Sequence, residues 1–199
     1  MPSQARNSYS LAAQQRDVLY GLASSIPPFF ATADETEQSC LKASVACGVG
    51  CWEGYIENVL REFVLKTKTG ITKRPWQLIS QFEYVVQRLT DDLNTPSWDK
   101  VRELVHTITG IDPTPAWSCT PLFANTQSAK DFFDGLMKVR HSFAHGFNVP
   151  HGIPHLVTQG KLDGGYVATC HSLIDNLVFR TDALLDHELI HRHNCSNGW

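Results

Sequence analysis

The stretch around which the chain is organised runs from residue 138 to residue 146: Lys138-Val139-Arg140-His141-Ser142-Phe143-Ala144-His145-Gly146. It ends a segment, 128–144, whose apolar residues recur at the intervals of three and four that are typical of an amphipathic helix: Ala129, Phe132, Phe133, Leu136, Met137 and Phe143. On this helix Arg140 falls on the apolar stripe, four residues after Leu136 and seven after Phe133. A cation in that position needs a structural or functional reason.

The end of this helix combines groups that favour opposite protonation states of a histidine. Gly146 is expected to stop the helix, which places His145 in the last turn beside unpaired carbonyls that favour its charged form. Arg140, about one turn earlier, opposes that charge, and a histidine balanced in this way suits proton transfer. Simple capping of the helix end is the alternative. The second histidine, His141, and the Gly-, Pro- and His-rich segment 147–165 favour a functional site.

The series Arg140-His141-Ser142-Phe143-Ala144-His145 resembles the motif of the HEPN superfamily, in which an arginine, a polar residue, three further residues and a histidine follow one another. HEPN proteins are small all-α domains, and many are metal-independent endoribonucleases. In them the motif ends a late helix, beside a long early helix that is rich in small residues and carries a glutamate. Segment 35–66, with Ser44–Glu53 at its centre, matches that early helix. The order of elements over 35–193 is similar to the RiboL-PSP branch of the superfamily.

This resemblance implies roles for individual residues. His145 would take a proton from an RNA 2′-hydroxyl as that oxygen attacks the adjacent phosphorus, and Arg140 would bind the phosphate oxygens. His141 would orient the site or contact the phosphate. Glu53 would border the site, with Glu57 one turn further along, although a solvated helix edge explains both glutamates equally well. The resemblance also implies a homodimer, whose site joins the motifs of two protomers, and chemistry without a cofactor or a metal.

Composition limits the fold and the partners. With 199 residues, 42% hydrophobic and 19% charged, the chain can bury one sizeable core, and we expect a single domain over 1–199 with a loose stretch at 1–7. The formal net charge of -3 argues against a broad basic surface, so any contact with RNA must be local. Neither a secretory leader nor a membrane-spanning apolar run is recognisable. We therefore expect a cytoplasmic chain with reduced cysteines and no membrane partner.

The expected fold is an all-α, up-and-down helical bundle of HEPN type. Apolar periodicity and stop signals predict helices over 8–25, 35–66, 76–93, 97–109, 128–144 and about 165–193. In the first of these we expect the large apolar residues Leu11, Val18, Leu19 and Leu22 to point inward. The segment that follows the motif helix is expected to be a short insert, either irregular or a small hairpin.

One motif points to a different class of protein. His187-Glu188-Leu189-Ile190-His191 matches the His-Glu-x-x-His pattern of zinc proteases, in which two histidines hold the metal and the glutamate activates a water. The third ligand usually comes from farther along the chain, where only His193 and Cys195 offer suitable side chains, at the wrong spacing. We interpret the motif as a chance match on a histidine-rich helix end. A weak metal site formed by its two histidines and His193 stays open.

The sequence therefore predicts a metal-independent endoribonuclease that cleaves RNA at a composite dimer site. A toxin or host-defence setting, with a cognate antitoxin or defence partner, is the expected context. The main alternative is a non-catalytic HEPN-like module that serves binding or dimerisation. A zinc-dependent hydrolase that uses His187, Glu188 and His191 ranks third.

Overall fold

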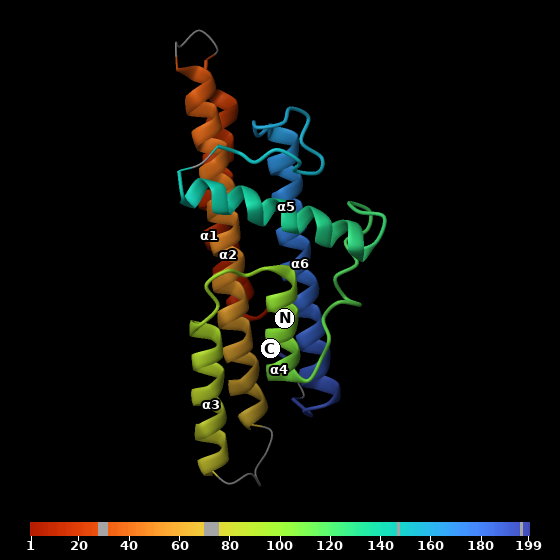
Figure 1. Cartoon of the computed structure of the whole chain (residues 1–199). Helices are drawn as coiled ribbons and strands as arrows, with labels where there is room; N and C mark the ends of the chain where they lie inside the picture. Colours follow the sequence, from red (N-terminus) through yellow and green to blue (C-terminus); the bar gives the residue numbers. More distant parts are fainter. Residues whose placement is uncertain (28–31, 70–75, 147, 196) are drawn as a thin grey trace. The chain divides into compact units, whose positions relative to one another are not determined.

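The computed structural model describes residues 1–27, 32–69, 76–146, 148–195 and 197–199. Within these ranges the chain is all helical and has no strand (Figure 1): α1 is Gln4–Ser25, α2 Ala33–Thr69, α3 Trp76–Asp91, α4 Trp98–Thr109, α5 Thr126–Ala144 and α6 Gly164–His191. The predicted all-α helical bundle is confirmed, including its long early helix. Of the helices so described, none has both the length and the apolar character that crossing a bilayer requires.

The helices contribute to two compact units. The first unit comprises Met1–Tyr9, Trp52–Trp117 and Leu177–Trp199, and the second comprises Ser10–Cys51 and Ser118–Asn176. Helices α1, α2 and α6 each supply a segment to both units, whereas α3 and α4 belong to the first and α5 to the second. Each unit is therefore assembled from segments that lie far apart in the sequence.

Aromatic side chains form the centre of the first unit. Trp52 stacks on Tyr55 with ring centroids 6.0 Å apart, and it meets Trp117 edge-on at 6.3 Å. Trp117 also meets Trp98 edge-on at 4.8 Å, and its indole N–H donates to Thr181 Oγ1 over 2.9 Å. Aromatic pairs of this kind bury large areas and prefer such geometries. They join α2, α4 and α6 through the loop that follows α4.

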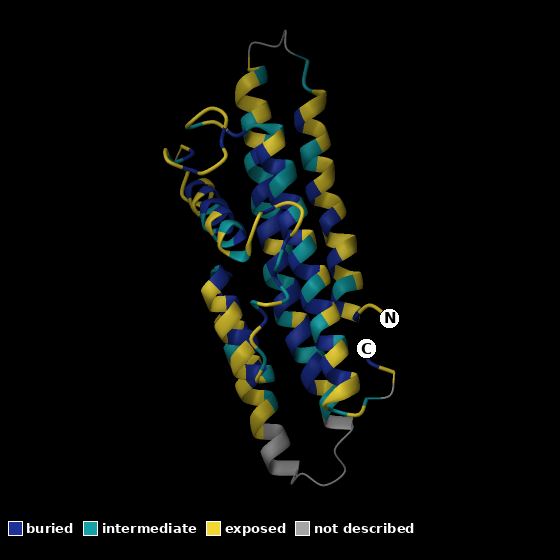
Figure 2. Ribbon diagram, turned by 90° about the vertical axis from the view of Figure 1, so that its right-hand side faces the viewer, coloured by how far each residue is buried: buried dark blue, intermediate teal, exposed yellow. Residues whose placement is uncertain are grey.

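Apolar side chains of α5 and α6 form much of the core of the second unit. The buried ones are Ala129, Phe132, Phe133, Leu136, Met137 and Val139 on α5, and Val167, Cys170, Leu173 and Ile174 on α6. The rings of Phe132 and Tyr166 lie 5.0 Å apart and connect the two helices. Gly135 lets the following segment approach α5, because a Cβ there would lie 3.3 Å from Cδ of Pro154. Figure 2 shows such buried residues following the helices, with exposed residues on their other faces.

The segment between α5 and α6 is irregular where the structure describes it, at residues 148–163. Its turns contain residues with positive φ, namely Gly152, His155 and Gly160. The Gln38 side chain of α2 fixes the end of the segment, since its amide group exchanges hydrogen bonds of 2.9 and 2.8 Å with the backbone of Leu162. Of the two forms that the sequence left open, the irregular insert is confirmed and the hairpin is wrong.

The inward face of α1 differs from the expectation. Leu11, Val18 and Leu22 were expected to be buried, yet they are 68%, 62% and 50% exposed. The buried residues of this helix are mostly small, and include one arginine: Ala5, Tyr9, Ala13, Arg16 and Ala23. The predicted inward face of α1 is therefore wrong. The helix packs through small alanine side chains and one buried arginine, and its large apolar residues lie on the exposed face.

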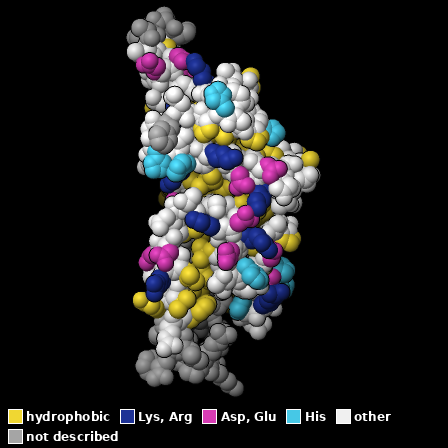
Figure 3. All heavy atoms as spheres, in the orientation of Figure 1, with side chains coloured by type: hydrophobic (Ala, Val, Ile, Leu, Met, Phe, Trp, Pro, Cys, Tyr) yellow, Lys and Arg dark blue, Asp and Glu magenta, His cyan; other side chains and the backbone are white. Residues whose placement is uncertain are grey.

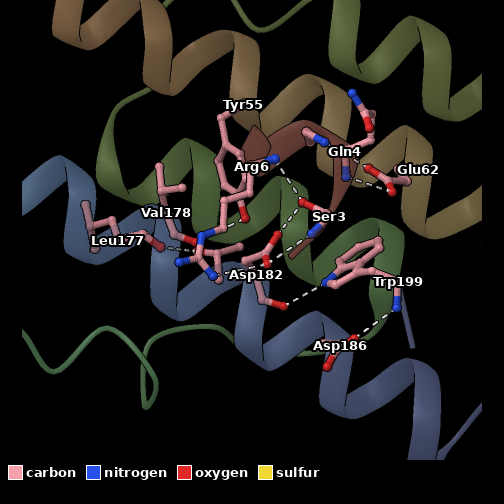
Figure 4. A network of polar contacts seen from close by, with 12 residues as sticks. Ser3, Gln4, Arg6, Tyr55, Glu62, Leu177, Val178, Asp182, Asp186 and Trp199 are labelled. Carbon is pink, nitrogen blue, oxygen red and sulfur yellow. Dashed lines mark hydrogen bonds and ion pairs between the residues drawn. The ribbon is translucent and has the colours of Figure 1, made fainter. Parts of the chain in front are cut away.

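The expected loose stretch at residues 1–7 is also wrong, because α1 begins at Gln4 and its start is bonded to α6 (Figure 4). Ser3 precedes the helix, and its Oγ accepts a hydrogen bond from the Arg6 N–H over 2.9 Å, as an N-cap does. The same hydroxyl donates to the Asp182 carboxylate, which also accepts the Ser3 N–H over 3.3 Å. Trp199 bonds to the same turn, since its indole N–H donates to the Asp182 carbonyl oxygen over 3.1 Å.

Glu62 of α2 completes the N-terminal cap of α1. Its Oε1 accepts the Gln4 N–H over 3.1 Å, and its Oε2 accepts the Ala5 N–H over 3.0 Å. The first N–H groups of a helix have no partner within the helix and carry partial positive charge. A carboxylate that accepts two of them therefore holds the start of α1 against α2.

Replacing Glu62 by alanine should lower the free energy of unfolding by about 1–2 kcal/mol, because two N–H groups lose their acceptor. Urea unfolding of the purified protein measures this. Glu57→Ala is the matched control on the same helix, since Glu57 makes only a 3.9 Å ion pair with Arg61, and it should change stability by less than about 0.5 kcal/mol. Equal effects of the two substitutions would contradict the assigned role of Glu62.

Candidate functional site

The candidate site lies at the C-terminal end of α5, in the second unit. The helix starts at a proper cap, because the Asn125 side chain accepts the Ser128 N–H over 2.8 Å. At the other end His145 occupies the C-cap, and its N–H donates to the His141 carbonyl over 3.2 Å. Gly146 follows with a φ of 70°, a left-handed conformation that glycine adopts without strain. The predicted stop signal is confirmed.

The motif residues differ in exposure. Arg140 is half-buried, whereas His141 and His145 are exposed. Ser142 is buried, and its Oγ donates to a backbone carbonyl one turn earlier over 2.7 Å. Phe143 was expected on the buried stripe but is 38% exposed, because the stripe ends before the last turn. Figure 3 shows histidine side chains at the surface of the face drawn there.

The two exposed histidines of the motif face each other. They are one helical turn apart, and their ring centroids lie 4.3 Å from each other with the planes inclined by 56°. At this separation both rings can reach the same small group. Imidazole both donates and accepts protons near neutral pH, so the pair offers the groups that acid–base chemistry needs.

Arg140 supplies an anion-binding group. Throughout the described ranges, no hydrogen bond and no ion pair joins its guanidinium to another residue. Arg140 is half-buried as a residue, and its N–H donors have no protein acceptor among the described residues, so they can take up an acceptor from outside the chain. A phosphate group provides oxygen acceptors in the matching geometry, so it is a natural complement.

The two accessory glutamates lie on the part of α2 that belongs to the first unit, whereas the motif belongs to the second. Both are half-buried, and Glu57 Oε2 lies 3.9 Å from Nη2 of Arg61. The structure thus brings Arg140, His141 and His145 together on one helix end. The expected place of Glu53 and Glu57 beside them stays a prediction.

The His-Glu-x-x-His motif lies at the end of α6. Oε2 of Glu188 is 2.9 Å from Nε of Arg192, so this carboxylate already has a cationic partner. The ring of His193 packs edge-on against a phenylalanine of α2. In the part of the chain that the structure describes, no group of three or more His, Cys, Asp or Glu side chains is arranged to hold a metal. The three protein ligands of a catalytic zinc site are therefore not assembled there.

Sequence reasoning missed a polar cluster in the second unit, centred on Arg16 of α1. This arginine is only 4% exposed. Its Nη1 and Nη2 donate to the two carboxylate oxygens of Asp175 over 3.0 and 3.3 Å, and its Nε donates to Asp17 over 2.9 Å. Gly48 of α2 leaves room for the side chain, since a Cβ there would lie 3.2 Å from Cδ of Arg16. The bidentate pairing offsets the cost of burying the charge.

The same cluster contains a serine, a histidine and an aspartate, as a hydrolase triad does. Ser44 Oγ lies 3.0 Å from His171 Nε2, and His171 Nδ1 lies 4.0 Å from Asp17 Oδ1. Ser44 is fully buried, however, and its hydroxyl donates to the Arg16 carbonyl over 2.9 Å. Because its only proton is committed, Ser44 accepts a hydrogen bond from the histidine and cannot meet a substrate. The cluster joins α1, α2 and α6 and is not a nucleophilic site.

Two features of the sequence could have revealed this cluster. His171 lies within an apolar stretch of α6, and Arg16 shares a helix face with alanines. A polar residue on an otherwise apolar helix face is more informative than the apolar residues around it, because it must find partners inside the fold. Burial lowers the pKa of His171 to about 4, and the nearby Arg16 adds to this effect.

Comparison with known proteins adds nothing for or against these assignments. No protein-family model matches the chain, and no curated protein or solved structure matches it. The HEPN resemblance therefore remains a prediction from the motif and the order of the helices.

Stability should fall at acid pH because His171 is held neutral. Its pKa is about 4 in the folded chain against an ordinary 6.5, so the unfolded chain binds a proton that the folded chain does not between these values. The contribution of neutral His171 is thus complete above pH 6.5 and is lost as the pH falls toward 4. By about pH 4.5 the free energy of unfolding should have fallen by about 2–3 kcal/mol through this histidine. Urea unfolding at a series of pH values between about 4.5 and 7 measures the change.

Carboxylates add an acid dependence of their own, so a variant isolates the contribution of the histidine. His171→Gln keeps a donor toward Ser44 but cannot be protonated, and its stability should depend less on pH than that of the parent. His106→Gln, at an exposed position of α4, should follow the parent. Parallel curves for the parent and His171→Gln would refute the prediction.

Proposed function

We propose that the chain is a metal-independent endoribonuclease whose site is built from Arg140, His141 and His145 at the end of α5. The observation that carries this proposal is the combination of a half-buried arginine, whose guanidinium is unpaired among the described residues, with two exposed imidazoles on the same helix end whose ring centroids lie 4.3 Å apart. Such a set can bind a phosphate and move protons, the two requirements of phosphoryl transfer. The likeness of the motif to that of HEPN nucleases supports RNA as the substrate.

The proposed reaction is an internal displacement at phosphorus. His145 accepts the proton of the ribose 2′-hydroxyl, and the 2′-oxygen forms a bond to the adjacent phosphorus while the bond from phosphorus to the 5′-oxygen breaks. The equivalent histidine of a second protomer gives a proton to the leaving 5′-oxygen. The products are a 2′,3′-cyclic phosphate and a 5′-hydroxyl, and no metal or cofactor takes part.

Arg140 stabilises the charge that grows on the non-bridging oxygens during this displacement. A guanidinium donates two parallel N–H groups to such oxygens, and these charge-assisted hydrogen bonds are stronger than neutral ones. His141 stands beside His145 and orients it or contacts the same phosphate. Since the net charge of the chain is -3, binding depends on these local contacts and not on a basic surface.

We place this activity in a homodimer that acts in a toxin or host-defence system. The homodimer follows from the HEPN resemblance, in which two motifs complete one site. An exposed nuclease site needs control in the cell, and a cognate antitoxin or defence partner that covers the end of α5 would provide it.

Arg140→Ala and His145→Ala should each slow RNA cleavage by about 100-fold or more, because one removes the phosphate ligand and the other the base. The assay follows a labelled RNA in EDTA and identifies the cyclic phosphate end. Arg88→Ala and His106→Ala are matched controls, since both residues are exposed on α3 and α4, and both variants should cleave as the parent does.

Thermal unfolding of the two site variants should match that of the parent, so that lost activity cannot be attributed to lost structure. A variant of Arg140 or His145 that cleaves as fast as the parent would refute the nuclease proposal. A parent that forms a dimer but cleaves no RNA would also refute it and would support the non-catalytic binding module.

A further inference from the structure

We propose that His187 and His191 form a two-histidine site for a divalent transition-metal ion at the C-terminal end of α6, in the first unit. Both side chains are exposed, and their ring centroids lie 4.2 Å apart with the planes inclined by 41°. Residues four apart on a helix lie one above the other. One nitrogen from each ring can therefore reach the same ion at the usual metal–nitrogen distance of about 2.1 Å.

The surroundings of this pair favour a cation. Oε1 of Glu188 lies 3.8 Å from Nδ1 of His187, beyond hydrogen-bond distance but close enough for the negative charge to favour a cation bound by the histidine. Arg192, the next cation along the chain, is already paired with Glu188 at 2.9 Å. Helix α6 ends at His191, and the negative end of the helix dipole also attracts positive charge.

The histidine pair of α5 has the same spacing but a poorer charge environment. Its ring centroids are 4.3 Å apart, so the geometry of the ligands does not distinguish the two pairs. Lys138 and the unpaired Arg140, however, lie within the same two turns as His141 and His145. Two cations within two helical turns of the histidines oppose the binding of a divalent ion by electrostatic repulsion. Charge therefore selects the α6 pair.

The number of protein ligands determines how tightly the ion is held and whether it stabilises the fold. His193 is not a third ligand, because its ring packs edge-on against Phe63 with centroids 5.4 Å apart and no group of three ligands is assembled among the described residues. With two protein ligands the remaining coordination positions fall to water, so the ion exchanges readily and does not hold the fold together. Imidazole ligands select Ni²⁺, Cu²⁺ or Zn²⁺ over Mg²⁺ and Ca²⁺. The site does not depend on the proposed nuclease activity.

Calorimetric titration of the metal-free chain with NiCl₂ tests the proposal. Nickel is the probe because it prefers imidazole, whereas the free cysteines of the chain would compete for zinc. We expect one ion per chain, and at least tenfold weaker binding in His187→Gln and in His191→Gln, since each variant turns a chelate into a single ligand. The double variant His141→Gln with His145→Gln is the matched control and should bind nickel as the parent does.

Thermal unfolding supplies a second measurement. NiCl₂ should raise the unfolding midpoint of the parent, because the ion binds the native helix and not the unfolded chain, and it should leave the midpoint of His187→Gln unchanged. Binding that survives both α6 substitutions, or that the α5 double variant abolishes, would overturn the proposal. So would a parent that binds no nickel at millimolar concentration.

Discussion

A buried positive charge determines how the helices of the second unit pack. Arg16 is almost completely withdrawn from water, which is costly unless opposite charges compensate it. Asp175 of α6 and Asp17 of α1 provide that compensation, and the Arg16 backbone carbonyl receives the Ser44 hydroxyl of α2. One residue thus contributes to the register of three helices. Sliding α6 by one turn would separate the guanidinium from Asp175, and sliding α2 would separate the Arg16 carbonyl from Ser44.

Arg140 shows the opposite arrangement on the same chain. It is half-buried at a helix end, and among the described residues it has no carboxylate to neutralise it. Because the same fold supplies two carboxylates to Arg16, the lack of a carboxylate at Arg140 among the described residues supports our proposal that Arg140 binds a ligand from outside the chain. This contrast separates an arginine that maintains the structure from one that is available for chemistry.

Periodicity and stop signals predicted the helices, because these depend on local backbone preferences and on which face of a helix is apolar. The juxtaposition of His141 and His145 was equally predictable, since residues one turn apart on a helix must meet. The inward face of α1 was not, because this helix packs through alanines and because Asp175, which pairs with Arg16, lies 159 residues away in the sequence. The place of Glu53 depends on tertiary contacts in the same way, and no local pattern encodes it.

The bonds between Ser3 and Asp182 span 179 residues, and this separation has a consequence for biosynthesis. On the ribosome, the first turn of α1 emerges long before the turn of α6 that receives it. Asp182 follows Asn176, the last residue of the second unit, by only six residues, so both units obtain their segments of α6 at nearly the same time. The start of the chain therefore stays without its Asp182 partner, and accessible to chaperones and proteases, until α6 has emerged.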